Sequence, residues 1–516
     1  MAHFEKKQAN NRKYILFLLT VRHGMSLAFP ESRALYVNIQ PKETAMRRTT
    51  RWHLLLGFFL LCLGLPQTIP AVETKIMGFT DVTTQLADTD FSSKGKADKL
   101  QATQRSRIWV MMNASENVGG TMMFELDNIW GRDAAGMRGG SLGTDGVNIG
   151  VKEAYIDWKI PNSTIRVRMG LQPFILPGIG AVNPYTHEVD SVTTMWARGA
   201  GVMVSGELSE NVALTTFWLR AANDNSANNF MDNADLGGFI LPIRWEGFDI
   251  RPWAMISFAG KNDPFFTYRP TLTPAYPVHA SPSSVAGDDP DDYAMGWWAG
   301  VAATVTALDP WKFALDFNYG DIKGVTEEMD RGGWYASFLA EYDMDVVVPG
   351  LLAWYASGDD GDPRNGSERL PTILGNWYGS SMSFSGQFDN FAWQSQLLGL
   401  EPSGTWGVSL YLRDFSFIPD VKHTLRALVY GGTNDDDMAR YVNDGYTKVA
   451  GVPTWLYLTQ SDHVVELNFN TTWQIYDNLQ WSFEASWMNL NRGDCWELPG
   501  HENNGYRIAS TVRFLF

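Results

Sequence analysis

The last residues of the chain, 504–516, alternate in polarity and end on a bare phenylalanine. One side is apolar apart from a serine and carries Tyr506, Ile508, Ser510, Val512, Phe514 and Phe516. The other side carries Arg507, Ala509, Thr511, Arg513 and Leu515. Because successive strand side chains point to opposite sides, we expect a strand with one apolar wall and one mostly polar wall. A membrane barrel supplies lipid for the apolar wall and a first strand for pairing. A terminal strand of an ordinary sheet is the alternative.

The same alternation recurs from residue 75 onward and is clearest in 311–320, where aromatic and aliphatic residues alternate with small or polar ones. Tight turns alternate with long polar connections. The turns are at 115–117, 161–163, 209–211, 246–247, 308–310, 419–420 and 476–478, and the long connections at 131–148, 223–236, 260–292, 358–403 and 432–462. Such asymmetry is typical of bacterial outer-membrane barrels, with short periplasmic turns and long extracellular loops.

The pattern predicts an all-β fold, a transmembrane antiparallel β-barrel of about 18 strands, in which the last strand pairs with residues 76–87. About 16 strands is the alternative, because residues 237–260 are irregular and contain Pro242 and Pro252. Composition agrees: the chain has 48 glycines, 13% aromatic residues and a mean hydropathy of −0.20. It has no long apolar run after the N-terminal region, so a helical membrane bundle is disfavoured.

The N-terminal region has the organisation of a secretory signal peptide. Arginines 47, 48 and 51 precede the apolar run 54–65, and small residues follow, with cleavage expected near Ala71. We therefore assign 46–71 as the signal peptide and 72–516 as a single porin-type barrel domain. Residues 1–45 are interpreted as an over-long start or a prefix. Export leaves Cys495 as the only cysteine. The net charge of −16 argues against nucleic acid as a partner.

Arginines recur on the strand sides that we expect to face the lumen. The predicted pore-lining basic residues are Arg105, Arg107, Arg166, Arg168, Arg220, Arg413 and Arg426, and Arg507 and Arg513 of the last strand are also predicted to face the lumen. The predicted pore-lining acids are Glu125, Asp127, Glu153 and Asp157. A ladder of arginines across a wide, water-filled pore is one interpretation. The alternative is a solvated wall in which mixed charges pair.

The third long connection, 173–197, is less polar than the other loops. Its many apolar residues predict a loop that folds into the lumen and packs on the wall. Its acids, Glu188 and Asp190, would then face the arginines and create a transverse field that filters solutes by charge. The competing interpretation is a loop that clasps a neighbouring subunit. No plug domain precedes the first strand, so we expect an open pore.

The stretch 72–516 resembles the outer-membrane homotrimeric porins of sulfate-reducing, Desulfovibrio-type bacteria, and more distantly the general porins. The matching stretches are 75–79 (KIMGF), 104–107 (QRSR), 151–158 (VKEAYIDW), 168–173 (RMGLQP) and 513–516 (RFLF). The resemblance implies a homotrimer, passive diffusion of small hydrophilic solutes and a third-loop constriction. It also implies that Phe516 is the membrane-insertion signal read by the barrel-assembly machinery.

We therefore expect a porin in the bacterial outer membrane, in contact with lipid and lipopolysaccharide. A substrate-specific channel is the first alternative, although the inward aromatic residues are scattered rather than serial. An enzyme is disfavoured, because no Gly-x-Ser-x-Gly motif accompanies the histidines. We expect no cofactor; the acid clusters 288–292, 359–362 and 435–437 are interpreted as solvated loops, with loop-bound Ca²⁺ or Mg²⁺ as the alternative.

Overall fold

The computed structural model describes residues 72–88, 99–131, 140–142, 149–179, 193–222, 233–260, 293–324, 327, 330–377, 379–384, 397–398, 402–441, 446–449, 452–496 and 503–516. The predicted signal peptide at 46–71 and the segment 1–45 lie outside the described residues. Residues 70–516 form one compact unit.

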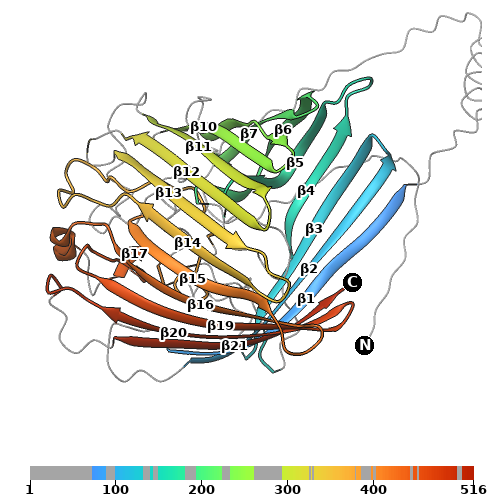
Figure 1. Ribbon diagram of the computed structural model, residues 1–516. Coiled ribbons are helices and arrows are strands. Elements are labelled where there is room, and N and C mark those ends of the chain that lie inside the picture. Colours follow the sequence, from blue (N-terminus) through green and yellow to red (C-terminus); the bar gives the residue numbers. More distant parts are fainter. Residues whose placement is uncertain are drawn as a thin grey trace, which may run out of the picture. The chain divides into compact units, whose positions relative to one another are not determined.

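Antiparallel strands dominate this unit, and nearly every strand pairs with the strands before and after it in the sequence (Figure 1). The strands are β1 (Glu73–Asp88), β2 (Lys99–Ser115), β3 (Val118–Ile129), β4 (Ile149–Lys159), β5 (Arg166–Ile175), β6 (Trp196–Ser209), β7 (Val212–Ala222), β8 (Ala234–Ile240), β9 (Ile243–Trp245), β10 (Phe248–Gly260), β11 (Tyr293–Leu308), β12 (Trp311–Lys323), β13 (Arg331–Tyr342), β14 (Val348–Ala356), β15 (Thr405–Phe415), β16 (Val421–Gly432), β19 (His463–Tyr476), β20 (Leu479–Asn491) and β21 (Asn504–Leu515). A short 3₁₀ helix, η5 (Asp436–Tyr441), and a separate hairpin of β17 (Tyr446–Val449) and β18 (Val452–Leu456) belong to the connection between β16 and β19.

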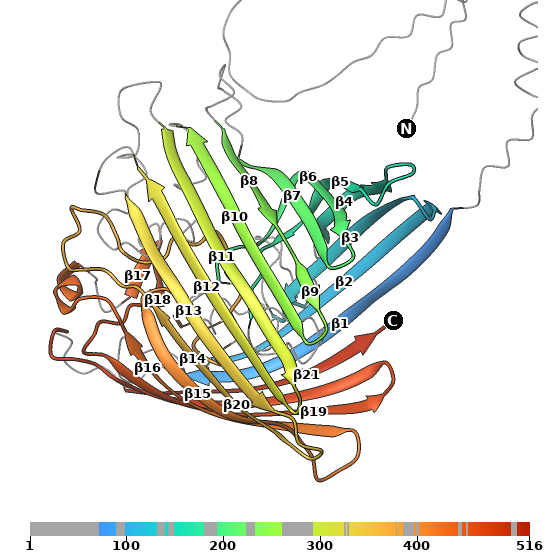
Figure 2. The same cartoon turned by 45° about the horizontal axis from the view of Figure 1, so that its top comes forward.

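The first and last strands close the sheet into a barrel (Figure 2). β1 pairs antiparallel with β21 from Phe79 opposite Leu515 to Asp88 opposite Tyr506. Gly78 and Phe516 exchange two backbone hydrogen bonds, of 2.8 and 3.0 Å. Closure removes the exposed edges that an open sheet would present. The predicted pairing of the last strand with residues 76–87 is confirmed.

In the described part of the chain the sheet contains 19 strands, of which β8 and β9 share one position, so the barrel has 18. Both pair with β7 on one side and β10 on the other, and the break between them falls at Leu241 and Pro242. Proline has no N–H to give to a strand ladder, so the ladder is interrupted there. The irregularity seen in the sequence is therefore one broken strand, and the barrel has 18 strands rather than 16.

The alternation of each strand separates an apolar outer wall from a more polar inner wall. In β12 the side chains of Leu315 and Phe317 are exposed, whereas Asp316 and Asn318 are buried. In β21 Ile508 and Phe514 are exposed, and Arg507 is buried. An apolar outer wall is what a barrel surrounded by lipid requires. No helix in the described part of the chain is long and apolar enough to cross a membrane.

Short turns and long connections alternate along the strands, as the sequence predicts. The turn between β4 and β5 is formed by residues that favour a tight turn. Asn162 adopts a positive φ of 58°, a conformation that asparagine tolerates. The Ser163 hydroxyl accepts a hydrogen bond from the Ile165 N–H at 3.1 Å.

Candidate channel lining and constriction

The inner wall formed by β2, β3 and β4 carries a chain of ion pairs between predicted lining residues. Arg105 pairs with Asp127 at 3.0 Å, and Arg107 pairs with Glu125 at 2.6 Å. Strand register explains both pairs, because each arginine stands directly opposite its acid across the β2–β3 ladder. Lys152 adds a second cation on Glu125 at 2.8 Å. The structure thus brings these predicted residues together as paired groups.

Asp157 on β4 serves two arginines of β5. Arg168 pairs with it at 3.0 Å and lies over the ring of Tyr155, and Arg166 also pairs with it. The side chains of Arg166 and Arg168 remain 45% and 32% exposed. Two guanidinium groups share one carboxylate here, so this wall keeps a surplus of positive charge in contact with water.

Glu153, the remaining predicted acid, pairs with Arg198 on β6 at 2.9 Å. Arg198 is not among the predicted lining residues, because it falls at the end of the third connection rather than in a clear strand pattern. In the structure it opens β6, next to Trp196, over whose ring its guanidinium lies at 4.9 Å.

Arg220 departs from the prediction. On β7 the buried side chains are Phe217 and Leu219, whereas Trp218 is 42% exposed. Strand alternation therefore places Arg220 with Trp218 on the outer side, where Arg220 pairs with Asp235 at 2.9 Å. The inner side of β7 is apolar because Phe174 packs on it, with a ring distance of 5.7 Å to Phe217. The arginine is thus separated from the other predicted lining residues.

Arg413 and Arg426 lie on the opposite wall. Arg413 pairs with Glu341 of β13 at 2.8 Å. Arg426 is only 3% exposed and lies 5.7 Å from the ring of Tyr411. Both line a cavity of ≈ 830 Å³ beside the turn between β15 and β16. Of the two remaining predicted residues, Arg513 pairs with Asp81 at 2.6 Å across the closure, and Arg507 pairs with Glu484 at 3.3 Å.

The described ends of the third connection leave the wall and contact residues across the lumen. Ile179 is buried in one cluster with Ala302, Ala314 and Leu339 of β11, β12 and β13. Arg251 of β10 donates a hydrogen bond to the carbonyl oxygen of Gly178 at 3.5 Å. Residues 180–192 lie outside the described residues, and with them Glu188 and Asp190. The inward fold of the whole connection therefore stays a prediction.

A second connection, between β14 and β15, also runs along the inner wall. Its described residues 370–384, with 378 excepted, are called the inner segment below. The Trp298 indole N–H of β11 donates to the carbonyl oxygen of Pro371 at 2.8 Å, and the Trp377 indole N–H donates to the Tyr335 hydroxyl of β13 at 2.9 Å. Trp377 and Phe384 pack against Trp354. The inner segment thus contacts several strands in succession.

The inner segment corrects the interpretation of 358–403 as an external loop. The signal that could have found it was the one used for the third connection. Residues 370–384 include Leu370, Ile373, Leu374, Trp377, Met382 and Phe384 and carry no charged side chain. A loop of this composition has more reason to pack on an inner wall than to extend into water.

The two connections meet inside the barrel. The Trp196 N–H donates to the Leu374 carbonyl at 2.6 Å, and the Ile373 N–H donates to the Thr194 carbonyl at 2.8 Å. Met195 and Leu374 form a parallel bridge. Main-chain pairing of this kind holds the inner segment to the start of β6 as a short extra strand.

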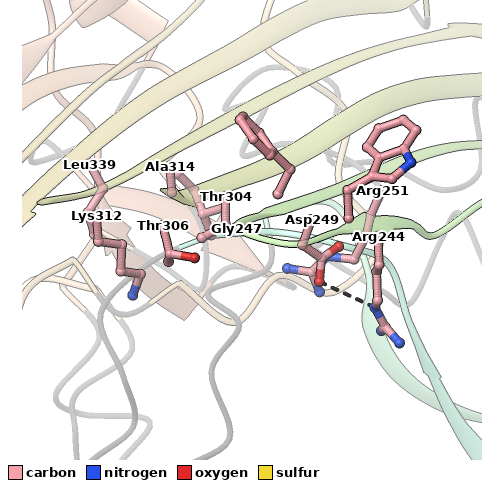
Figure 3. A pocket seen from close by; sticks show the side chains of 12 residues that line it. Arg244, Gly247, Asp249, Arg251, Thr304, Thr306, Lys312, Ala314 and Leu339 are labelled. Carbon is pink, nitrogen blue, oxygen red and sulfur yellow. Dashed lines mark ion pairs between the residues drawn. The ribbon is translucent and has the colours of Figure 1, made fainter. Parts of the chain in front are cut away.

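A cavity of ≈ 370 Å³ lies between the third connection and the wall (Figure 3). Arg244, Asp249 and Arg251 gather at one end of it, and Lys312 lies at the other. Asp249 pairs with both arginines at 3.5 Å. Ile179 of the third connection also lines the cavity. Charged groups therefore continue along the wall toward the short turns.

The acid clusters of the loops are the candidate metal ligands. Among the described residues, no group of three or more His, Cys, Asp or Glu side chains is placed to hold a metal ion. Asp362 pairs with Arg364 at 2.9 Å, and Asp436 accepts a hydrogen bond from the Ser461 N–H at 3.1 Å. The cluster at 288–292 lies outside the described residues.

No family model and no curated protein matches the sequence. Similar solved structures include Pseudomonas aeruginosa OprD, with 11% identity, 86% of this chain and 96% of that chain covered, and a TM-score of 0.48. A BenF-like porin from Pseudomonas fluorescens Pf-5 has 10% identity, coverages of 86% and 99%, and a TM-score of 0.48. Acinetobacter baumannii OccAB4 has 9% identity, coverages of 86% and 98%, and a TM-score of 0.47.

Proposed function

We propose that this chain is a channel of the bacterial outer membrane through which small hydrophilic solutes and ions diffuse. The observation that carries the proposal is the division of a closed 18-strand barrel into an apolar outer wall and a charged inner wall. A barrel of this width is too wide for wall side chains to fill, so water occupies what inserted segments leave. The barrel and its lining need no catalytic centre for this role.

The narrowest part is proposed to lie where the third connection and the inner segment meet. The contacts of Ile179, Gly178 and Leu374 support this location. The proposed water path runs along β2 to β6, where Arg166 and Arg168 stay partly exposed. Glu188 and Asp190 are proposed to face these arginines, so that solutes cross a transverse field.

A substrate-specific channel is the second candidate. The observation that favours it is the inner segment, because a strip of wall covered by protein leaves a narrower path than an open barrel would. A diffusion channel conducts in proportion to salt concentration. A specific channel has a small conductance that its substrate blocks.

Planar-bilayer recording of the purified full chain tests the proposal. Stepwise conductance increases and a measurable reversal potential in a salt gradient are expected. A folded, inserted protein that conducts no current would contradict a channel of either kind.

Assembly forms a further part of the proposal. We propose a homotrimer in contact with lipid and lipopolysaccharide, a signal peptide at 46–71, and Phe516 as the signal read by the barrel-assembly machinery. Cross-linking in outer-membrane vesicles measures the number of subunits. N-terminal sequencing of the exported protein locates the end of the signal peptide. Deleting Phe516 should reduce the amount of inserted barrel, and an unchanged amount would refute its role.

A further inference from the structure

Glu466 is a fully buried carboxylate on the inner side of β19, with 0% of its surface exposed. Its cross-strand neighbours are Leu428 of β16 and Met488 of β20, both buried. An ionised carboxylate in such surroundings costs several kcal/mol unless hydrogen bonds and charges compensate for the lost water. The identity of its partners therefore decides what the residue does.

Three of its hydrogen bonds come from the inner segment. The Ser380 hydroxyl donates to Oε1 at 2.7 Å, and the Met382 N–H donates to the same oxygen at 3.1 Å. The Ser383 hydroxyl donates to Oε2 at 2.5 Å. On the wall side, the Tyr430 hydroxyl donates to Oε2 at 3.1 Å and the Asn468 amide to Oε1 at 2.8 Å. Removing the segment would take away most of the donors that make the buried charge tolerable.

The neighbours of Glu466 hold the same short stretch. The Ser381 N–H donates to Oδ1 of Asn468 at 3.3 Å, and the Asn470 amide donates to the Ser381 hydroxyl at 3.2 Å. Arg507 of β21 donates to the Ser381 carbonyl at 2.8 Å. Residues 380–383 are thus fixed through directional bonds to β19 and β21. The aromatic packing of Trp377 and Phe384 lacks this directionality, because the hydrophobic effect does not favour one register over another.

We propose that Glu466 is the positioning residue that fixes how far the inner segment reaches into the lumen, and that it thereby sets the cross-section of the channel. The inference rests on the proposed channel function. Glu466 itself need not touch the solute. It acts through the segment, because it supplies the acceptor to which Ser380, Met382 and Ser383 converge.

Single-channel conductance of Glu466→Ala and Glu466→Gln tests the inference. We expect roughly a two-fold higher conductance for the alanine variant and a smaller rise for glutamine, because conductance follows the open cross-section. A double variant on the segment side, Ser380→Ala with Ser383→Ala, should reproduce the rise while Glu466 is intact. It also keeps the test valid if the Glu466 variants fail to fold, which heat-modifiable migration in SDS gels reports.

Asp462→Asn is the matched control. Asp462 is also 0% exposed, but its described partners are Thr459, Gly493 and Trp496 rather than the inner segment. Its loss removes one buried carboxylate without touching the segment, so the conductance should stay at the wild-type value. Equal conductance of wild type and every Glu466 and serine variant would overturn the inference while leaving a conducting channel. A wild-type protein without conductance would instead refute the channel function.

A disulfide cross-link distinguishes the effect of the inner segment's position from the effect of the charge on Glu466. In a Cys495→Ser background, Ser381→Cys and Asn470→Cys place two thiols where the side chains now bond. Oxidation should return the Glu466→Ala variant to wild-type conductance, and reduction should raise it again. If the oxidised variant still conducts more than wild type, the lost charge rather than the segment's position is responsible, and the inference fails.

Discussion

The two halves of the inner wall differ in what covers them. On β2 to β6, charged side chains face one another in ion pairs, and Arg166 and Arg168 remain partly exposed. On β11 to β21, the inner segment covers the wall through aromatic packing and a buried carboxylate. One half therefore carries partly exposed charges, whereas the other carries a segment of the chain, which we propose narrows the lumen. The variants below separate these two roles.

The largest effect is expected for Trp377→Ala in the covered half. Trp377 is 0% exposed, and its ring centroid lies 4.8 Å from that of Trp354 and 4.7 Å from that of Phe384. Its indole N–H donates a hydrogen bond to the Tyr335 hydroxyl. Truncating a buried tryptophan costs about 3–5 kcal/mol, so the inner segment should detach. Protease cleavage within 370–384 measures this. Trp334→Ala on the outer wall is the control, and equal cleavage of both variants would contradict the assigned role.

A smaller effect is expected in the exposed half. Replacing Arg166 and Arg168 together by glutamine leaves Asp157 without its two arginines. The anion-to-cation permeability ratio should fall, on the order of two-fold, because the surplus of positive charge is lost. Reversal potentials in a salt gradient measure it. Asp157→Asn should move the ratio in the opposite direction, and shifts of the same sign in both variants would break the proposed contrast between the halves.

A pH effect of smaller size is expected at Glu368, two residues before the inner segment. Burial raises the pKa of Glu368, which accepts a hydrogen bond from the Asp360 N–H at 3.1 Å. A raised carboxyl pKa means that the docked state favours the protonated form. The stabilisation is fully present below the pKa of the undocked state and is lost as the pH rises through the higher pKa of the docked state.

Glu368→Gln imitates the protonated form at neutral pH. It should protect the inner segment from protease slightly, because the group is partly solvated. The wild-type protein should gain the same protection on acidification, whereas the glutamine variant should not. Pulsed proteolysis at two pH values compares them, and an identical pH response in both would exclude Glu368 as the cause.

The smallest effect is expected for Arg220→Ala. Because Arg220 shares the outer side of β7 with Trp218, its removal should leave the reversal potential unchanged. Arg168→Ala removes the same charge from the lumen and should shift it. A shift of equal size for both would mean that Arg220 faces the solute path after all.

Alternation and turn spacing were sufficient to predict the barrel and its closure, because both depend on each strand and its neighbour. They failed at β7, where each side of Val212–Ala222 mixes apolar residues with a threonine, so Arg220 was taken as the mark of the inner side. There the choice depends on Phe174 of β5, which packs on Phe217 although β6 separates the two strands. The inner segment was missed for a related reason: its donors, Ser380 and Ser383, look like ordinary loop residues until Glu466 is placed beside them.

The closure between β1 and β21 has a consequence for how the molecule is made. Arg513 and Asp81, whose side chains bond across it, are 432 positions apart in the sequence. Among the described residues, the other pairings join barrel strands that are consecutive or one barrel strand apart in the chain, so hairpins can form early and this contact must form late. Until it does, both edges of a long sheet stay unpaired and open to association with other chains. The final dozen residues therefore decide whether synthesis of the whole chain yields a sealed cylinder or an aggregation-prone sheet.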